Sequence, residues 1–143
     1  MYKIKDLYDL NETIAAELFE GKEYPWEVLA DIGDFILKLG DKLPKDEFTK
    51  KGDNIWIHKS VTIAPTATLN GPLIIDEGTE VRPGAFIRGK AIVGKNCVVG
   101  NSTELKNVVL FNTVQVPHYN YVGDSILGTH SHICLLYTSP SPR

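Results

Sequence analysis

Residues 57–115 read IHKSVT-IAPTAT-LNGPLI-IDEGTE-VRPGAF-IRGKAI-VGKNCV-VGNSTE-LKNVVL-FNTVQ, with a large apolar residue at the head of every hexapeptide. These anchors are Ile57, Ile63, Leu69, Ile75, Val81, Ile87, Val93, Val99, Leu105 and Phe111. A second, mostly smaller residue follows each anchor by four positions. Between the two lie Gly, Pro and Asn, the residues that turn a chain at low cost.

A period of six matches neither a helix nor a flat strand. It is typical of a solenoid in which each hexapeptide makes one short side and one corner, with three sides to a coil. The sequence therefore predicts an all-β solenoid, a single-stranded left-handed parallel β-helix of the hexapeptide-repeat kind. This left-handed coiling is opposite to the right-handed crossover that is usual between parallel strands. A β-sandwich with accidental phasing is the alternative, and the unbroken run of anchors disfavours it.

The composition is that of a soluble globular protein. The 143 residues are 43% hydrophobic and 23% charged, and their net charge is −3. We expect no nucleic-acid partner, because the chain is not basic, and no membrane, because no apolar run approaches the roughly 20 residues of a membrane span. Cys97 and Cys134 do not make a disulfide framework. We therefore expect a cytoplasmic protein.

Residues 1–54 are expected to form an N-terminal helical cap and linker. Apolar residues at helical spacing predict one helix over residues 6–20 and a second that begins at Pro25 and ends near Gly40. The charged stretch 41–53 follows and is expected to be a linker. A cap is expected because the end of a solenoid leaves an open edge.

Residues 55–133 are expected to form the β-helix, with an irregularity near its end. Beyond Phe111 the next anchor position is Pro117, so the pattern predicts one deformed coil, and irregular repeats often hold sites. Residues 134–143 depart from the repeat in period and composition. They resemble a translated sequencing adaptor, so we expect a non-native tail and a truncated β-helix.

Two elements resemble a known family. They are VGNSTELK at Val99–Lys106 and PHYNYVGD at Pro117–Asp124. They are similar to the V-G-N-x-x-E-[ML]-K and H-x-x-Y-[LV]-G-D elements, at the same spacing, of the acetyltransferase half of the bifunctional bacterial enzyme that makes UDP-N-acetylglucosamine. The whole chain resembles single-domain bacterial proteins called UDP-N-acetylglucosamine pyrophosphorylase-related. Asn101 belongs to the first element and is expected to be a substrate contact.

The resemblance implies roles for individual residues. His118 matches the family's catalytic base, Tyr121 its substrate-contacting tyrosine and Lys106 a lysine that holds the sugar phosphate. The family's phosphate-binding arginine falls on Arg88 when counted back from Lys106, whereas the local sequence Arg-Pro-Gly matches the family better at Arg82. Both arginines therefore remain candidates. The resemblance also implies a homotrimer with active sites between neighbouring β-helices.

The implied reaction is transfer of an acetyl group from acetyl-CoA to an amino-sugar phosphate or nucleotide sugar. A histidine suits the base because its pKa lies near working pH, and Arg and Lys suit a phosphate. No Gly-rich nucleotidyltransferase motif occurs, so uridylyl transfer is not expected. The coils that would bind acetyl-CoA are expected beyond Ile133, so we expect this truncated chain to be inactive.

Two other functions are considered. A non-catalytic β-helix could serve trimerisation or regulate a separate sugar nucleotidyltransferase, because fold does not fix function. A γ-class carbonic anhydrase uses the same fold with three zinc-binding histidines, but its H-x4-H pair does not occur here, so no metal is expected. The chain's histidines are His58, His118, His130 and His132.

Overall fold

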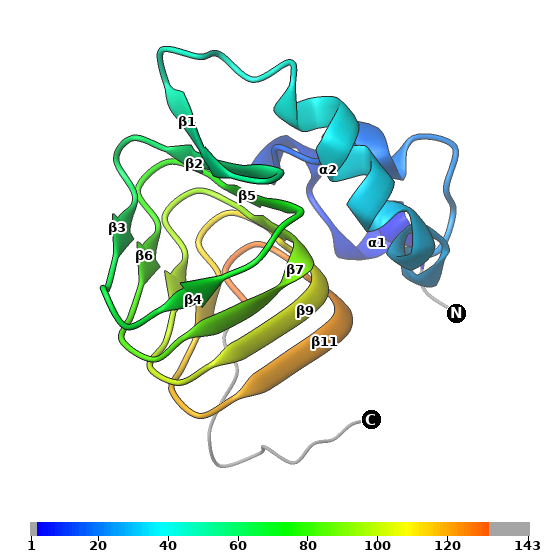
Figure 1. Ribbon diagram of the computed structural model, residues 1–143. Coiled ribbons are helices and arrows are strands. Elements are labelled where there is room, and N and C mark those ends of the chain that lie inside the picture. The colour runs from blue at the N-terminus through cyan, green and yellow to red at the C-terminus, as the bar shows by residue number, and fades with distance from the viewer. Residues whose placement is uncertain (1–2, 132–143) are drawn as a thin grey trace.

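The computed structural model describes residues 3–131 and shows a left-handed parallel β-helix with a helical segment packed beside it (Figure 1). The first side of the coil holds β2 (Ile55–His58), β5 (Leu73–Ile75), and the second halves of β7 (Phe86–Val93), β9 (Glu104–Leu110) and β11 (Tyr121–Leu127). The second side holds β3 (Thr62–Ile63), β6 (Glu80–Val81), β8 (Val98–Val99) and β10 (Gln115–Val116). The third side holds β4 (Thr68–Leu69) and the first halves of β7, β9 and β11.

The anchors predicted from Ile57 to Leu105 form the interior, as expected. Neighbouring coils pair in parallel, so that Ile57, Ile75 and Val93 lie level on the first side. Ile63, Val81 and Val99 lie level on the second side, and Leu69, Ile87 and Leu105 on the third. All but Ile63 and Leu69 in the first coil are buried. Burial of each such side chain contributes about 1.5 to 3 kcal/mol to the hydrophobic stabilisation of the column.

The prediction that the repeat fails beyond Phe111 is wrong. Leu110, Val116 and Val122 continue the three interior columns, level with Val93, Val99 and Leu105. The corner between the third and first sides has three residues in β7 but two in β9 and β11. Each anchor after the corner in β9 therefore comes one residue earlier than a count in sixes places it, and Leu127, after the corner in β11, comes two residues earlier. Counting in sixes therefore landed on Phe111 and Pro117, neither of which is in the interior column.

The N-terminal segment, residues 3–40, differs from the two predicted helices. In place of a helix over residues 6–20 there are α1 (Ile4–Leu7) and the 3-10 helices η1 (Leu10–Glu12) and η2 (Ala16–Phe19). The Asp9 carboxylate accepts from the backbone N–H of Asn11 at 3.0 Å, and the Thr13 hydroxyl accepts from that of Ala15. Such local bonds compete with a continuous helix.

The second predicted helix begins at Pro25 as a 3-10 helix and continues as an α-helix. These are η3 (Pro25–Asp31) and α2 (Ile32–Gly40). The expected linker over residues 41–53 contains β1 (Phe48–Gly52), which pairs antiparallel with β2. β1 thus covers the first-side edge of the first coil, which would otherwise expose unpaired backbone groups.

The N-terminal segment lies along the first side of the solenoid rather than over its end (Figure 1). The row of outward-facing residues on this side is apolar in every coil: Trp56, Ile74, Ile92, Val109 and Ile126. Tyr8 donates a hydrogen bond to the carbonyl of Ile126 at 3.2 Å, and its ring lies 5.2 Å from that of Phe111. The segment therefore buries a stripe that solvent would otherwise meet.

No helix in residues 3–131 has the length and apolarity needed to cross a bilayer. The expected tail over 134–143, together with His132 and Ile133, lies outside the described residues.

Candidate functional site

The corner that carries His118 is rigidly held. It joins β10 to β11, and the carbonyl of Pro117 accepts from the Thr103 hydroxyl at 2.8 Å and from the Asn120 side-chain amide at 3.0 Å. The same amide donates to the carbonyl of His118 at 3.3 Å, and the backbone N–H of Tyr119 donates to the carbonyl of Asn101 at 2.9 Å. The backbone is therefore fixed, while the His118 side chain stays exposed.

Gly100 permits this corner to lie close to the coil before it. A Cβ atom on Gly100 would lie 2.6 Å from the carbonyl oxygen of Val116 and 2.8 Å from the backbone nitrogen of His118. Both neighbours are backbone atoms that cannot move aside as a flexible side chain can. A glycine is therefore needed here to keep His118 in place.

His118 lines a small hollow together with Arg82 and Asn101; we call these three residues and their surroundings the histidine hollow. Its volume is about 160 Å³, and Val98, Val116 and Pro117 are among its other walls. Arg82 is held by Glu80, with Nε 3.3 Å from the carboxylate. The fold thus brings together three expected site residues from three successive coils.

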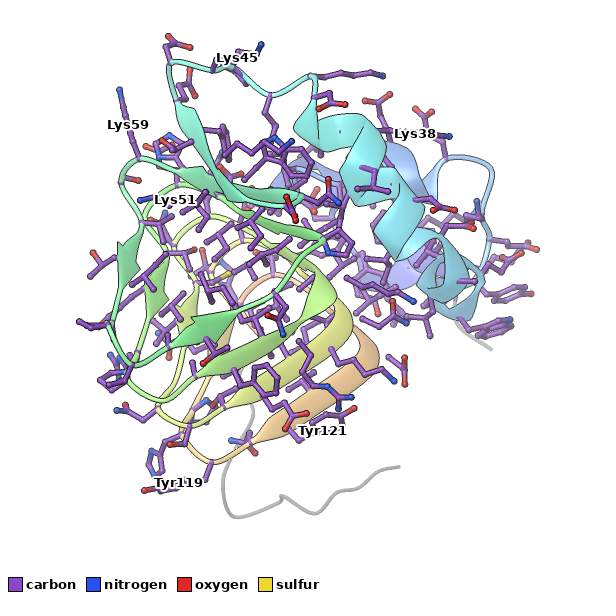
Figure 2. All side chains as sticks on the ribbon, viewed as in Figure 1. Lys38, Lys45, Lys51, Lys59, Tyr119 and Tyr121 are labelled. Atoms are coloured by element: carbon purple, nitrogen blue, oxygen red, sulfur yellow. The ribbon has the colours of Figure 1, made fainter. Side chains whose placement is uncertain are left out.

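The remaining expected residues, Arg88, Lys106 and Tyr121, lie along the third side and at the corner that follows it. Together with Glu104 and Asp124 they form what we call the ion-paired patch. The Arg88 guanidinium donates to the Glu104 carboxylate at 2.9 Å, and Lys106 Nζ lies 3.9 Å from Asp124 Oδ2. Tyr121, one coil further along the chain, lies level with Glu104, and its side chain is exposed. Figure 2 shows Tyr121 and Tyr119 projecting from the same region of the solenoid surface.

Sequence reasoning missed the acidic members of this patch. Glu104 and Asp124 stood inside the quoted family elements, yet no role was expected of them. A neighbouring residue, Asn107, donates to Asp124 at 2.9 Å, and its own buried Oδ1 has no partner among the described residues. Arg88 and Lys106 each have a carboxylate about one coil further along the sequence, and this spacing could have indicated the two ion pairs.

Two other reactive side chains, Cys97 and His58, are buried within the fold. Cys97 is buried at a corner, and this burial raises the pKa of its thiol to about 11. His58 is also buried, and its Nδ1 lies 2.8 Å from the Ser60 hydroxyl. Within residues 3–131, no three His, Cys, Asp or Glu side chains are grouped as metal ligands would be.

Comparison with known proteins gives consistent matches to the β-helix. The family described as "GMPPB C-terminal domain" matches residues 69–135. The "Bifunctional protein GlmU" of Nostoc sp. is 39% identical over 104 residues, which cover 71% of this chain and 21% of the relative. Its namesake in Methanococcus maripaludis is 38% identical over 125 residues, covering 75% and 26%. The chain thus spans about a quarter or less of the length of these two relatives.

Proposed function

We propose that this chain, which belongs to the hexapeptide-repeat family as a homologue of the GlmU proteins, is part of an acyltransferase that acetylates the amine of an amino-sugar phosphate or nucleotide sugar. The observation that carries the proposal is the histidine hollow. An exposed imidazole on a rigid corner, beside an arginine and an amide, is the arrangement that general-base catalysis needs.

In this proposal His118 accepts a proton from the acceptor amine as its nitrogen attacks the thioester carbonyl. A new C–N bond forms, the C–S bond breaks, and the sulfur leaves as a thiolate that takes up the proton held on His118. The acyl donor, acetyl-CoA, supplies the acetyl group. Since no covalent acyl-enzyme is needed, a base and a means of positioning suffice.

The ion-paired patch is proposed to hold the substrate phosphate. Arg88 and Lys106 lie near one end of the third side, and the corner with His118 precedes the other end. A phosphate would replace the carboxylates of Glu104 and Asp124 as partner of these cations, and the exposed ring of Tyr121 would contact the sugar. Arg82 contacts the acceptor at the opposite end, inside the histidine hollow.

We further propose that the functional form is a homotrimer. The third side exposes the aromatic rings of Phe86 and Tyr121 beside the ion-paired patch. A second β-helix packed against this side would cover the rings and close the open face of the site.

A non-catalytic regulatory module is the second candidate, and one observation favours it. Arg82, Arg88 and Lys106 each already have a carboxylate partner within this chain. Cations satisfied in this way can stabilise the surface without any substrate, although exposed pairs contribute little, about 0 to 1 kcal/mol.

The test is an assay of the natural gene product with acetyl-CoA and glucosamine-1-phosphate or related amino sugars. Release of the CoA thiol and formation of the N-acetylated sugar, followed together by thiol titration and mass spectrometry, support acyl transfer. Thiol release without an acetylated sugar, or no release with any acceptor, would leave the regulatory module as the better account.

A further inference from the structure

We propose that Tyr119 is a positioning residue for His118, because its ring holds the imidazole in the orientation that the proposed base needs. The centroids of the two rings are 5.1 Å apart and their planes meet at 88°, which is an edge-to-face contact. Tyr119 stands at a position that the family element H-x-x-Y-[LV]-G-D leaves open. The inference rests on the proposed acyl transfer, since it concerns the base of that reaction.

The fold does not need a tyrosine at this position. Gly84, Ser102 and Tyr119 lie level at the same corner of three successive coils. All three have a left-handed backbone, with φ of 75°, 54° and 60°. The backbone N–H of Ser102 donates to the carbonyl of Pro83 at 3.1 Å, just as that of Tyr119 donates to the carbonyl of Asn101 at 2.9 Å. Glycine and serine therefore build the same corner.

The left-handed backbone makes a tyrosine costly at this corner. A residue with a Cβ atom crowds the following carbonyl oxygen when φ is positive, and a bulky side chain rarely adopts this conformation. Residues held in such conformations cluster at functional sites, where the surrounding structure offsets the strain. Tyr119 therefore contributes something other than the geometry of the turn.

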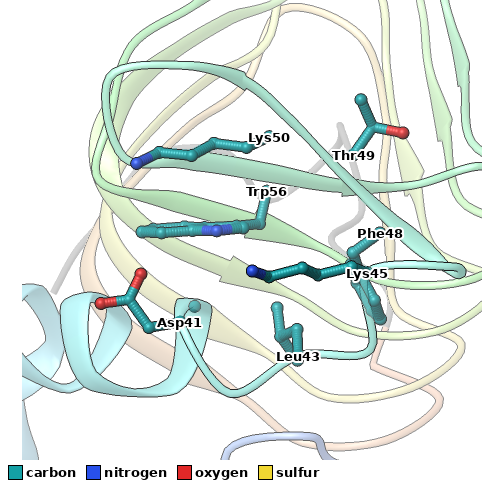
Figure 3. Close-up of a pocket in the computed structure, with 8 residues that line it drawn as sticks. Asp41, Leu43, Lys45, Phe48, Thr49, Lys50 and Trp56 are labelled. Carbon is teal, nitrogen blue, oxygen red and sulfur yellow. The ribbon is translucent and has the colours of Figure 1, made fainter.

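Burial does not explain the tyrosine either. Its side chain is 76% exposed, the highest value among the large hydrophobic residues within 3–131, and Figure 2 shows it at an outer corner of the solenoid. Trp56, by contrast, is only 6% exposed, and Figure 3 shows Lys50 on one side of its indole with Lys45 on the other. An aromatic ring left in solvent gains little hydrophobic stabilisation, so its role depends on the neighbour that it contacts.

That neighbour is an imidazole whose backbone is fixed while its side chain is not. The Thr103 hydroxyl and the Asn120 amide donate to the carbonyls of Pro117 and His118, and none of these bonds reaches the imidazole ring. They leave the side-chain torsions of His118 free. A base acts efficiently only when it is held within a narrow range of positions and angles. The ring of Tyr119 supplies this restraint, because it blocks rotation of the imidazole toward its own side.

The kinetic test places the residues of the two preceding coils at this corner. Tyr119→Ser and Tyr119→Gly in the natural gene product should both fold, with melting temperatures close to that of the wild type. Their kcat for acetyl transfer should fall about three- to tenfold, the effect of losing one aromatic pair, with little change in KM. Tyr119→Phe keeps the ring and should retain most of the turnover. Trp26→Ser, at an exposed aromatic residue of the N-terminal segment, is the control and should leave kcat unchanged.

A second measurement follows the orientation of His118 directly. Three-bond NMR couplings should report one χ1 rotamer of His118 in the wild type and in Tyr119→Phe, and averaging over rotamers in Tyr119→Ser. A single rotamer that persists in Tyr119→Ser, an unchanged kcat in that variant, or an equal loss of kcat in Tyr119→Phe would each overturn the proposal. The couplings need no substrate. A gene product without acyl transfer would therefore refute the proposed function, and the couplings alone would then decide whether Tyr119 orients His118.

Discussion

Val93 and Leu110 lie side by side in neighbouring coils although they are seventeen residues apart, one fewer than the eighteen between Ile75 and Val93. The shorter step comes from the corner after Leu105, where Lys106 and Asn107 replace a three-residue turn. It keeps the interior columns apolar to Val122 and sets the positions of both Pro117 and His118. The regularity of the coil therefore continues through the candidate site.

Ile87→Asp should destabilise the β-helix strongly. Ile87 is fully buried in the third-side column, and a carboxylate there would be desolvated without a partner. We expect a loss of several kcal/mol in the free energy of unfolding, about 3 to 5, measured by urea denaturation. The control is Thr62→Asp, at an exposed outward position of the second side, which should cost about 1 kcal/mol or less. Similar losses in the two variants would contradict the assignment of inside and outside.

Phe111→Ala should loosen the N-terminal segment rather than the coil. The Phe111 ring packs against Tyr8 at 5.2 Å and Phe19 at 5.6 Å. Its truncation removes the contacts that hold α1 and η2 to the solenoid, so trypsin should cleave at Lys22 sooner than in the wild type. Leu110→Ala, in the interior column, should instead lower the stability of the whole β-helix by about 2 to 5 kcal/mol. If trypsin cleaved the Phe111→Ala variant at Lys22 no faster than the wild type, the result would be evidence against this packing.

The hexapeptide anchors were predictable because a narrow interior demands a large apolar residue at a fixed interval. The two-residue corner after Leu105 was not, since Leu110 and Phe111 are both large and apolar and either residue could continue the count. The β1 strand was likewise hidden, because its outward side chains are charged and its pairing with β2 is a tertiary contact. The signal for the packed N-terminal segment was present in the apolar outward row from Trp56 to Ile126.

The candidate site was predicted residue by residue, but its division into two groups was not. His118 and Arg82 line one hollow only because corners of successive coils stack, and Arg88 pairs with Glu104 across one coil. Such neighbours depend on the register of the whole solenoid. The carboxylate partners of Arg88 and Lys106 were overlooked because a resemblance to substrate-binding residues carries no information about their pairing in the free chain.

Gly100→Ala should displace the corner that carries His118. The new methyl group would collide with backbone atoms of Val116 and His118, so we expect a loss of about 1 to 3 kcal/mol of stability. The amide resonances of residues 116–120 should shift in NMR spectra. Gly33→Ala is the control, because its methyl would meet only the flexible Lys90 side chain at 3.4 Å within a helix that prefers alanine. A Gly100 variant as stable as the Gly33 variant, with unshifted resonances, would contradict the close approach.

Cys97 should make stability fall at alkaline pH. Burial raises the pKa of its thiol to about 11, above the value of an unfolded chain. The stabilisation is complete below pH of about 8.5 and is lost as the pH rises toward 11, by about 2 to 3 kcal/mol, because only the unfolded thiol ionises in that range. Cys97→Ala should lack this part of the decline when urea midpoints are compared between pH 8 and 11. Parallel pH profiles for the two proteins would show that the thiol is not responsible.

The most direct measurement is the turnover of the natural gene product with acetyl-CoA and its amino-sugar acceptor, compared with that of His118→Ala and Lys106→Ala. The loss of a general base should lower kcat about 10²- to 10⁴-fold with little change in KM. The loss of a phosphate contact should mainly raise KM. An active enzyme whose kcat is unchanged by His118→Ala would contradict the central claim that this imidazole removes the proton from the attacking amine.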